Sequence, residues 1–367
     1  MSELMEIQEK IKHEIEIARQ NIKTDGYSMS IGEIINLYRD EELKLDPAFQ
    51  RLFRWEDEQK TKLIESILIG IPVPEIFVAQ KNDATWHVVD GVQRLSTLLQ
   101  LTGDLAGKEK LVMTSCKYIP SLKGKTWDDL PSETQRELKR IKLKINIILT
   151  QNSDEAQYEL FQRLNTGGTS LSDQEVRNCL MLMLDPNFFE KINELKDYKN
   201  FKDCLRLEQH SFEKEYHMEL ILRMFIGYFN HVDYDKHSPI STVKLNEFID
   251  IETINLIRNA DVSEFVNVFH RTFDLLKNSL GDKSFLKYNS QKSEFSGAFN
   301  VSVFEMLSVG ISSNIDAVEE LGKTQLEKLI KELHVQPSVQ DALARGVRAI
   351  VRFRDTTTIS REYFASR

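Results

Sequence analysis

The clearest hydrophobic pattern along the chain predicts a helix directly after Trp55. Residues 56–58 are all acidic and stand where negative charge favours the start of a helix. Apolar residues then recur three or four positions apart up to Leu68, which forms one apolar stripe. Gly70 is a natural C-terminal stop, and Pro72 prevents the helix from continuing. This is the best-delimited helix that the sequence predicts.

Other patterns place this helix in a mixed α+β domain. Short apolar and β-branched runs predict strands at residues 27–30, 43–46, 76–78, 86–89 and 143–149. Helical periodicity predicts a leading helix within residues 1–23 and further helices at 31–38, from 92, at 132–140 and from 152. Ser132 is the expected N-cap of the helix over 132–140. We expect one mixed sheet, with residues 103–141 as a connecting arm.

Beyond Asp185 the strand-like patterns nearly vanish. Helical periodicity predicts helices at about residues 188–195, 212–229, 242–257, 262–280, 299–313, 323–333 and 338–353. Ser172 and Glu175 form a capping box that starts one more helix just before this region. The simplest division is a leading helix over residues 1–26, a mixed domain over 27–184 and an all-helical domain over 185–367.

Composition and charge exclude several classes of protein. Of the 367 residues, 41% are hydrophobic and 29% are charged, as in soluble globular proteins. The formal net charge is −9, so any contact with nucleic acid requires a local basic face. Three widely separated cysteines fit neither a disulfide framework nor a zinc ribbon. Residues 1–23 lack the apolar core of a signal peptide, and the most apolar run, residues 218–229, is too short to span a bilayer. We therefore expect a cytoplasmic protein without membrane contact.

The candidate chemistry centres on residues 88–99, which are typical of a strand end, a tight turn and the start of an amphipathic helix. Gly91 follows the carboxylate of Asp90 and lets a ligand come close to the backbone. The helix N-terminus offers N–H groups to an anion, and Arg94 adds a cationic fork suited to phosphate. The alternative interpretation is an ordinary strand-turn-helix corner with Asp90 as the N-cap.

Two further segments share this polar, irregular character. One contains Gln50, Arg51 and Trp55, and the other contains Asn165, Thr166, Gly167 and Gly168. Together the three segments supply a carboxylate, arginines, amide side chains and glycine-bounded N–H groups. These are the parts needed to hold a nucleoside triphosphate and to align a water or a metal against its phosphates. Three unrelated loops are the alternative.

The order of these motifs matches a known family. F-Q-R-x-F-x-W ends at Trp55, V-V-D-G-V-Q-R ends at Arg94, and F-Q-R-L-N-T-G-G ends at Gly168. Over about residues 28–184 the chain closely resembles the N-terminal domain of GmrSD-type modification-dependent restriction enzymes, a family of the ParB/sulfiredoxin-like fold. The resemblance implies a mixed-sheet α+β domain of that fold. It carries no implication for the function of residues 185–367.

The same resemblance implies binding and hydrolysis of a nucleoside triphosphate, coupled to recognising or cutting DNA, often modified DNA. By position, the family signatures fall on Asp90, Gly91, Gln93 and Arg94, on Gln50, Arg51 and Trp55, and on Asn165, Gly167 and Gly168. We expect Asp90, Arg94 and Arg51 to be catalytic and Asp90 to bind Mg²⁺. The usual signature is D-G-Q-Q-R, whereas this chain has Val92 at the middle position.

Related branches differ from this chain in their key residues. Sulfiredoxins place a reactive cysteine in the equivalent turn, but no cysteine lies near Gly91–Arg94 in the sequence. The nuclease half of full-length GmrSD-type proteins contains an H-N-H-like metal site, which the eight histidines here do not form. The sequence therefore resembles the N-terminal half of such proteins with a helical companion.

Other charged positions have two interpretations each. Arg345, Arg348 and Arg352 fall at i, i+3 and i+7 of the last predicted helix, so they can form a basic stripe that follows a DNA backbone. A solvated or salt-bridged face is the alternative.

Histidines outside the central turn are weaker candidates. His210, Glu213, His217 and Glu219 could hold a metal, although an ordinary helix surface is favoured. His87 is favoured as a sheet residue over a catalytic base.

The sequence thus predicts a nucleoside-triphosphate-binding and hydrolysing protein of a bacterial or phage-defence, restriction-like system that acts on or senses DNA. Expected partners are the nucleotide with Mg²⁺, DNA and a separately encoded nuclease or methylase, and a homo-oligomer is allowed. Two alternatives stay open. One is a non-enzymatic nucleotide or DNA sensor that recruits a nuclease, and the other is a metal-dependent DNA nuclease.

Overall fold

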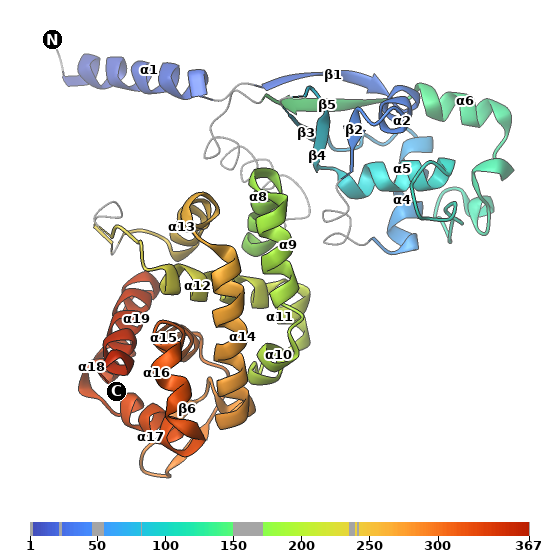
Figure 1. The fold of residues 1–367 in the computed structure, drawn as a ribbon. Helices are drawn as coiled ribbons and strands as arrows, with labels where there is room; N and C mark the ends of the chain where they lie inside the picture. Colours follow the sequence, from blue (N-terminus) through green and yellow to red (C-terminus); the bar gives the residue numbers. More distant parts are fainter. Residues whose placement is uncertain are drawn as a thin grey trace. The chain divides into compact units, whose positions relative to one another are not determined.

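The computed structural model describes residues 3–21, 24–45, 55–81, 83–149, 172–234, 239–240 and 242–366 (Figure 1). The chain divides into two compact units, Met1–Leu171 and Ser172–Arg367, which are described separately below. The first unit is α+β and the second is mostly helical, which confirms the predicted fold class. The domain boundary predicted after residue 184 corresponds to the end of α8 (Asp173–Leu184), the first helix of the second unit.

The described part of the first unit contains a mixed five-stranded sheet in the order β1-β5-β3-β4-β2. Its strands are β1 (Thr24–Ser30), β2 (Leu43–Lys44), β3 (Ile76–Gln80), β4 (Trp86–Asp90) and β5 (Lys142–Ile148). β5 pairs with β1 in antiparallel and with β3 in parallel orientation, and β4 pairs antiparallel with β3 and parallel with β2. All the predicted strands are therefore confirmed, and β4 ends at the carboxylate that the sequence singled out.

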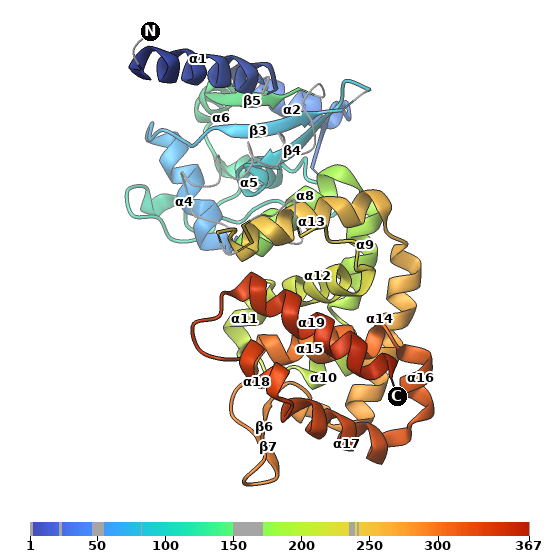
Figure 2. The ribbon, with the colours of Figure 1, turned by 90° about the vertical axis from the view of Figure 1, so that its left-hand side faces the viewer.

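Helices α2 (Ile31–Arg39), α4 (Asp57–Leu68), α5 (Val92–Thr102) and α6 (Ser132–Arg140) flank this sheet. The leading helix α1 (Glu3–Asn21) precedes β1, and its isoleucines are exposed. α4 and α5 pack against each other on one side of the sheet, and α2 packs against α6 (Figures 1 and 2). The predicted cap of α6 is wrong, because Pro131 is the N-cap and Ser132 already belongs to the helix.

Residues 103–131, here called the arm, connect α5 to α6 without long regular elements. Two short 3₁₀ turns, Pro120–Leu122 and Trp127–Asp129, interrupt it. The arm is nevertheless held firmly, because its apolar side chains at Leu111, Met113 and Leu122 are buried. In Figure 1 it lies at the right-hand edge of the first unit, beside α4 and α6.

The second unit is built around two helices that are buried along most of their length, α12 (Tyr216–Phe229) and α15 (Val301–Ser312). Around them lie α9 (Pro186–Leu195), α10 (Lys199–Cys204), α11 (Gln209–Glu213), α13 (Leu245–Asn259), α14 (Val262–Ser279), α16 (Ile315–Glu320), α17 (Gly322–His334), α18 (Pro337–Ala342) and α19 (Ala349–Ala365). A small hairpin of β6 (Lys287–Asn289) and β7 (Glu294–Ser296) follows the 3₁₀ turn Gly281–Lys283.

Two predicted helices of this unit are each broken in two. The helix predicted over 212–229 is α11 and α12, because Glu215 takes a left-handed conformation with φ 57° between them. The helix predicted over 338–353 is divided between α18 and the start of α19. α19 starts only at Ala349, after Gly346, which has a φ of 91°. No helix in the described stretches is long and apolar enough to cross a membrane.

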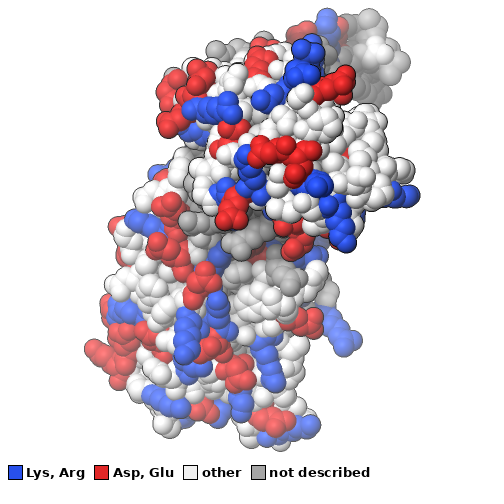
Figure 3. Space-filling model, turned by 90° about the vertical axis from the view of Figure 1, so that its right-hand side faces the viewer, with Lys and Arg blue, Asp and Glu red and all other residues white. Residues whose placement is uncertain are grey.

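The buried helices of the second unit approach one another closely. α15 packs against α19 and α12 (Figures 1 and 2), and glycines lie at both contacts. A Cβ added at Gly310 would lie 1.9 Å from Oγ of Ser360 on α19, and one at Gly227 would lie 2.4 Å from Val309. On the surface, the face in Figure 3 shows basic and acidic side chains interspersed.

Candidate functional site

The central turn has the geometry that its sequence predicts. β4 ends at Asp90, Gly91 takes a left-handed conformation with φ 91° and ψ 11°, and α5 begins at the next residue. A glycine is required here for two reasons. The left-handed region disfavours any residue with a Cβ, and a Cβ at this position would lie 2.9 Å from Cγ1 of Ile76. The chain therefore turns tightly from the strand into the helix.

The N-terminus of α5 is not capped by a side chain from the described residues. Gly91 is the N-cap and has no side chain to accept the first-turn N–H groups, and that turn contains no acidic residue. The alternative interpretation of Asp90 as the N-cap is therefore wrong. Uncapped N–H groups at the positive end of a helix dipole attract an anion, so this end of α5 suits a phosphate.

Asp90 and Arg94 form an ion pair across the turn. Nη2 of Arg94 donates to Oδ2 of Asp90 at 2.7 Å. The arginine side chain is only 12% exposed, whereas the aspartate side chain is 43% exposed. The guanidinium is thus held beneath the carboxylate, and the carboxylate is the partner that faces solvent. This arrangement orients Asp90, and it makes Arg94 a supporting group as much as a phosphate ligand.

Gln93 connects the turn to the segment before α4. Its Oε1 accepts a hydrogen bond of 3.1 Å from the backbone N–H of Trp55, whose side chain is half-buried. The end of the Q-R-x-x-x-W signature therefore lies at the D-G-V-Q-R turn. Gln50 and Arg51 lie outside the described residues, as do Asn165, Thr166, Gly167 and Gly168. Whether those groups join the same site stays a prediction.

The one departure from the usual signature lies in the core. Val92 is 3% exposed, so its side chain packs inside the domain rather than over the turn. His87 lies in β4, where its backbone is paired with Ala79 of β3 and with Lys44 of β2. This geometry favours His87 as a sheet residue, and its neighbour Trp86 packs edge-on against Tyr27 at 6.3 Å.

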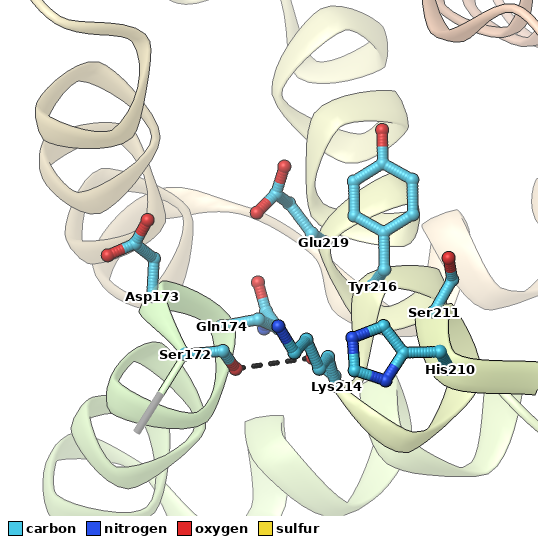
Figure 4. Close-up of a pocket in the computed structure, with 8 residues that line it drawn as sticks. All are labelled: Ser172, Asp173, Gln174, His210, Ser211, Lys214, Tyr216 and Glu219. Carbon is cyan, nitrogen blue, oxygen red and sulfur yellow. Dashed lines mark hydrogen bonds between the residues drawn. The ribbon is translucent and has the colours of Figure 1, made fainter. Parts of the chain in front are cut away.

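A pocket of about 320 Å³ opens in the second unit at the N-terminus of α8 (Figure 4). It is lined by Ser172, Asp173, Gln174, His210, Ser211, Lys214, Tyr216 and Glu219. The capping box predicted at the start of α8 is confirmed, and Oγ of Ser172 also contacts the backbone carbonyl of Lys214. In Figure 4 the side chain of Lys214 lies beside Gln174 and Ser172.

Of the predicted metal ligands His210, Glu213, His217 and Glu219, the side chain of Glu213 lies outside the described ones, and two of the others are committed elsewhere. Glu219 is buried and forms ion pairs with two arginines, Arg177 and Arg223. His217 is buried as a neutral imidazole. Burial, followed by the charge of Lys196, lowers the pKa of His217 to about 4. Within the described stretches no three His, Cys, Asp or Glu side chains gather as a metal site. The favoured interpretation of an ordinary helix surface holds for His210, which is exposed, and is wrong for His217 and Glu219, which are both buried.

Sequence reasoning missed a buried charge network that starts at Arg177 of α8. Arg177 contacts Asp250 of α13 at 2.5 Å and Glu219 of α12 at 3.3 Å. Arg223 then joins Glu219, at 2.6 Å, to Glu305 of α15, at 2.5 Å. Burial raises the pKa of Glu305 despite the nearby arginine. The only signal in the sequence was a charged residue inside each apolar helix, such as Arg223 and Glu305.

The three C-terminal arginines do not share one helix face. Arg345 lies in the turn between α18 and α19, and Arg348 is the N-cap of α19, so both are exposed outside the helix. Nη2 of Arg352 donates to the carbonyl of Val347 at 2.8 Å and helps to hold this turn. The predicted helical stripe is therefore wrong, because the chain leaves the helix at 343–348. DNA contact through these residues stays a prediction.

Comparison with known proteins agrees with the geometry of the first unit. Residues 31–182 match the family described as GmrSD restriction endonuclease, N-terminal domain. No curated protein and no solved structure gives a significant match to the chain. The match begins at α2 and ends within α8, and it includes the central turn. Residues 31–182 are thus similar to the N-terminal domain of GmrSD restriction endonucleases, and this similarity covers the described sheet and the central turn.

Proposed function

We propose that the GmrSD N-terminal domain binds a nucleoside triphosphate at the central turn and hydrolyses it, as a step in a defence system that acts on or senses DNA. One observation carries the proposal. The uncapped N-terminus of α5 lies directly beside a carboxylate that an arginine holds in place, Asp90 with Arg94 at 2.7 Å. A helix N-terminus attracts phosphate, and an oriented carboxylate suits a divalent cation or an attacking water.

Each described residue has a role in this proposal. The N–H groups after Gly91 bind phosphate oxygens, and Arg94 orients the carboxylate of Asp90. Asp90 fits Mg²⁺, since an exposed carboxylate oxygen is the ligand that this ion prefers. Bound Mg²⁺ would neutralise charge on the phosphates. Gln93 ties the turn to Trp55, through which Gln50 and Arg51 would reach the phosphates.

The loop with Asn165, Thr166, Gly167 and Gly168 is proposed to supply further N–H groups to the nucleotide. Arg345 and Arg348 are exposed and remain proposed contacts for DNA, with Arg352 as the residue that shapes their turn. A separately encoded nuclease or methylase is the proposed protein partner, because the helical unit adds no described metal site to the domain.

Phosphate release by the purified chain tests the proposal. We expect turnover of at least one of the four nucleoside triphosphates with Mg²⁺, and a loss of at least 100-fold in Asp90→Asn. Arg94→Gln should lower turnover and also weaken nucleotide binding. The matched control is the ion pair of Arg39, the last residue of α2, with Asp104, which follows α5; this pair is also 2.7 Å long. If Asp90→Asn behaves like Asp104→Asn, the site assignment is wrong.

A binding module without turnover is the second candidate. The observation in its favour is that Arg94 is already committed to Asp90 and is little exposed. This candidate expects saturable nucleotide binding with no phosphate release. Adding plain and modified DNA and scoring cleavage in the same reactions separates both candidates from a metal-dependent nuclease, which would cut DNA without any triphosphate.

A further inference from the structure

Lysines are frequent in the arm of the first unit. The stretch Leu105–Trp127 holds five lysines and one acidic residue, Glu109, and three aspartates, Asp104, Asp128 and Asp129, flank it, so the formal charge of the arm is 5 − 4 = +1, whereas the whole chain carries −9. The lysines are Lys108, Lys110, Lys117, Lys123 and Lys125, and all five are exposed. In an acidic chain, contact with a polyanion requires a local group of exposed basic side chains, and these lysines are such a group.

Hydrogen bonds fix the shape of the arm. Oε1 of Glu65 on α4 accepts from the backbone N–H groups of Tyr118 and Ile119, at 2.6 Å and 2.9 Å. Burial disfavours the charge on Glu65, but these N–H donors and Lys117 keep its pKa below the usual value. The backbone N–H of Met113 donates to the backbone carbonyl of Lys125 at 2.8 Å. The basic loop is therefore closed at both ends and presents its lysines from a fixed backbone.

The lysines of this loop keep their charge available. Among the described residues, Lys110 is the arm lysine that forms an ion pair, with Asp128 at 2.5 Å. The next carboxylate, Asp129, is used to bond Thr126. Lys117, Lys123 and Lys125 have no such ion pair within the described part of the chain. Three exposed lysines therefore lie within nine residues of the sequence.

An exposed aromatic ring accompanies these cations. Tyr118 is 63% exposed, and Nζ of Lys117 lies 5.1 Å from its ring centroid. Lysines bind phosphates, and exposed aromatic rings stack on unpaired bases or contact the sugar-phosphate backbone. Binding of an acidic protein would require the lysine charges but not the exposed ring of Tyr118. The combination therefore favours a nucleic acid.

The arm is separate from the central turn. It contacts the C-terminal half of α5, where Leu111 N–H bonds to the carbonyl of Gln100, whereas the turn lies at the N-terminus of the same helix. Gln93 and Gln100 are seven residues apart, which is about 10 Å along a helix. A polyanion on the arm would therefore leave the nucleotide turn accessible.

We propose that the arm binds the phosphate backbone of DNA through Lys117, Lys123 and Lys125, with Tyr118 as an aromatic contact. The inference deepens the proposed function, since it names the surface through which this domain meets DNA. It does not depend on nucleotide hydrolysis.

The test is DNA binding by the full chain, measured by fluorescence anisotropy with a 30-base-pair duplex and a single strand between 50 and 300 mM KCl. The arm variant is Lys117→Gln/Lys123→Gln/Lys125→Gln. The control variant, Lys287→Gln/Lys292→Gln/Lys323→Gln, removes the same charge from exposed lysines of the second unit. We expect the arm variant to bind at least 10-fold more weakly at 100 mM KCl, with a salt slope smaller by about 2 to 3.

Further measurements make the outcome decisive. Tyr118→Ala should weaken binding of the single strand more than that of the duplex. The proposal is overturned if the wild-type chain does not bind DNA, if the arm and control variants lose the same affinity, or if polyglutamate competes as well as DNA does. DNA-independent nucleotide binding should be unchanged in the arm variant, and circular dichroism confirms that it folds. Failure of the nucleotide site would leave these results intact, so the two proposals fail separately.

Discussion

The guanidinium of Arg177 and the carboxylate of Asp250 lie 2.5 Å apart with almost no access to solvent, at 0% and 4% of their side-chain surface. Arg177 is part of α8, the last helix that the family match reaches, and Asp250 belongs to α13. The pair therefore links α8, in which the family match ends, to α13 of the helical unit. Removing one member of such a pair leaves a buried charge without its partner.

Asp250→Asn should lower the free energy of unfolding by about 3 kcal/mol, because the charge of Arg177 stays buried. Replacing both residues by apolar ones, Arg177→Met/Asp250→Leu, should cost less than either single change. Chemical denaturation measures all three. Arg271→Met, which breaks an exposed pair with Glu319, is the control and should cost under about 1 kcal/mol. Equal losses in Asp250→Asn and Arg271→Met would contradict a buried ion pair.

His217 should make stability fall at mildly acidic pH. Its pKa is about 4 in the folded chain, below the ordinary value of about 6.5, so the unfolded state binds a proton first. Stability is therefore complete above pH 6.5 and is lost as the pH falls towards 4, by up to about 3 kcal/mol. His217→Asn should show a shallower loss of Tm between pH 7.5 and 5. Parallel curves for the two proteins would show that His217 does not contribute.

Gly310 is expected to tolerate no side chain, because α19 lies against it. Gly310→Ala should destabilise the chain by about 1 to 3 kcal/mol through overpacking, although alanine favours helices. The compensating variant Gly310→Ala/Ser360→Gly removes the clashing Oγ and Cβ atoms and should recover part of that loss. Thermal unfolding of both variants provides the comparison. No recovery in the double variant would mean that the contact with Ser360 is not the cause.

Gly91 should be more sensitive to substitution than Gly70, although both have a positive φ, 91° and 81°. Gly70→Ala meets no atom within 4 Å and should cost only the backbone strain, about 1 kcal/mol. Gly91→Ala adds a contact of 2.9 Å with Ile76 and should cost clearly more, while it also weakens nucleotide binding. Denaturation and nucleotide titration of both variants test this. Equal losses in the free energy of unfolding for Gly91→Ala and Gly70→Ala would show that the side chain of Ile76 moves to accommodate the added Cβ.

Local patterns were sufficient for most regular elements. α4 runs between the acidic start and the glycine stop that the sequence marks, and β5 follows its β-branched residues. These features depend on neighbours along the chain, so the sequence contains their cause. The strand-turn-helix at Asp90 was predicted for the same reason, and so was the family that residues 31–182 match.

Non-local contacts decided the rest. The sequence could not show that Glu215 and residues 343–348 interrupt two helices, because helical periodicity continues through both breaks. It could not show that Glu219 is buried between arginines, since each partner comes from a distant segment. The same holds for Glu65 of α4, whose carboxylate accepts the backbone N–H groups of Tyr118 and Ile119 and so anchors the arm.

The turn at Asp90 illustrates the division. The sequence by itself determined a carboxylate, a glycine and an arginine within one turn, because their spacing is a local property. Only the tertiary structure decided that Arg94 lies beneath Asp90 and that Val92 belongs to the core. Burial depends on how α5 packs against the sheet and α4, and this packing brings together atoms that the sequence keeps far apart.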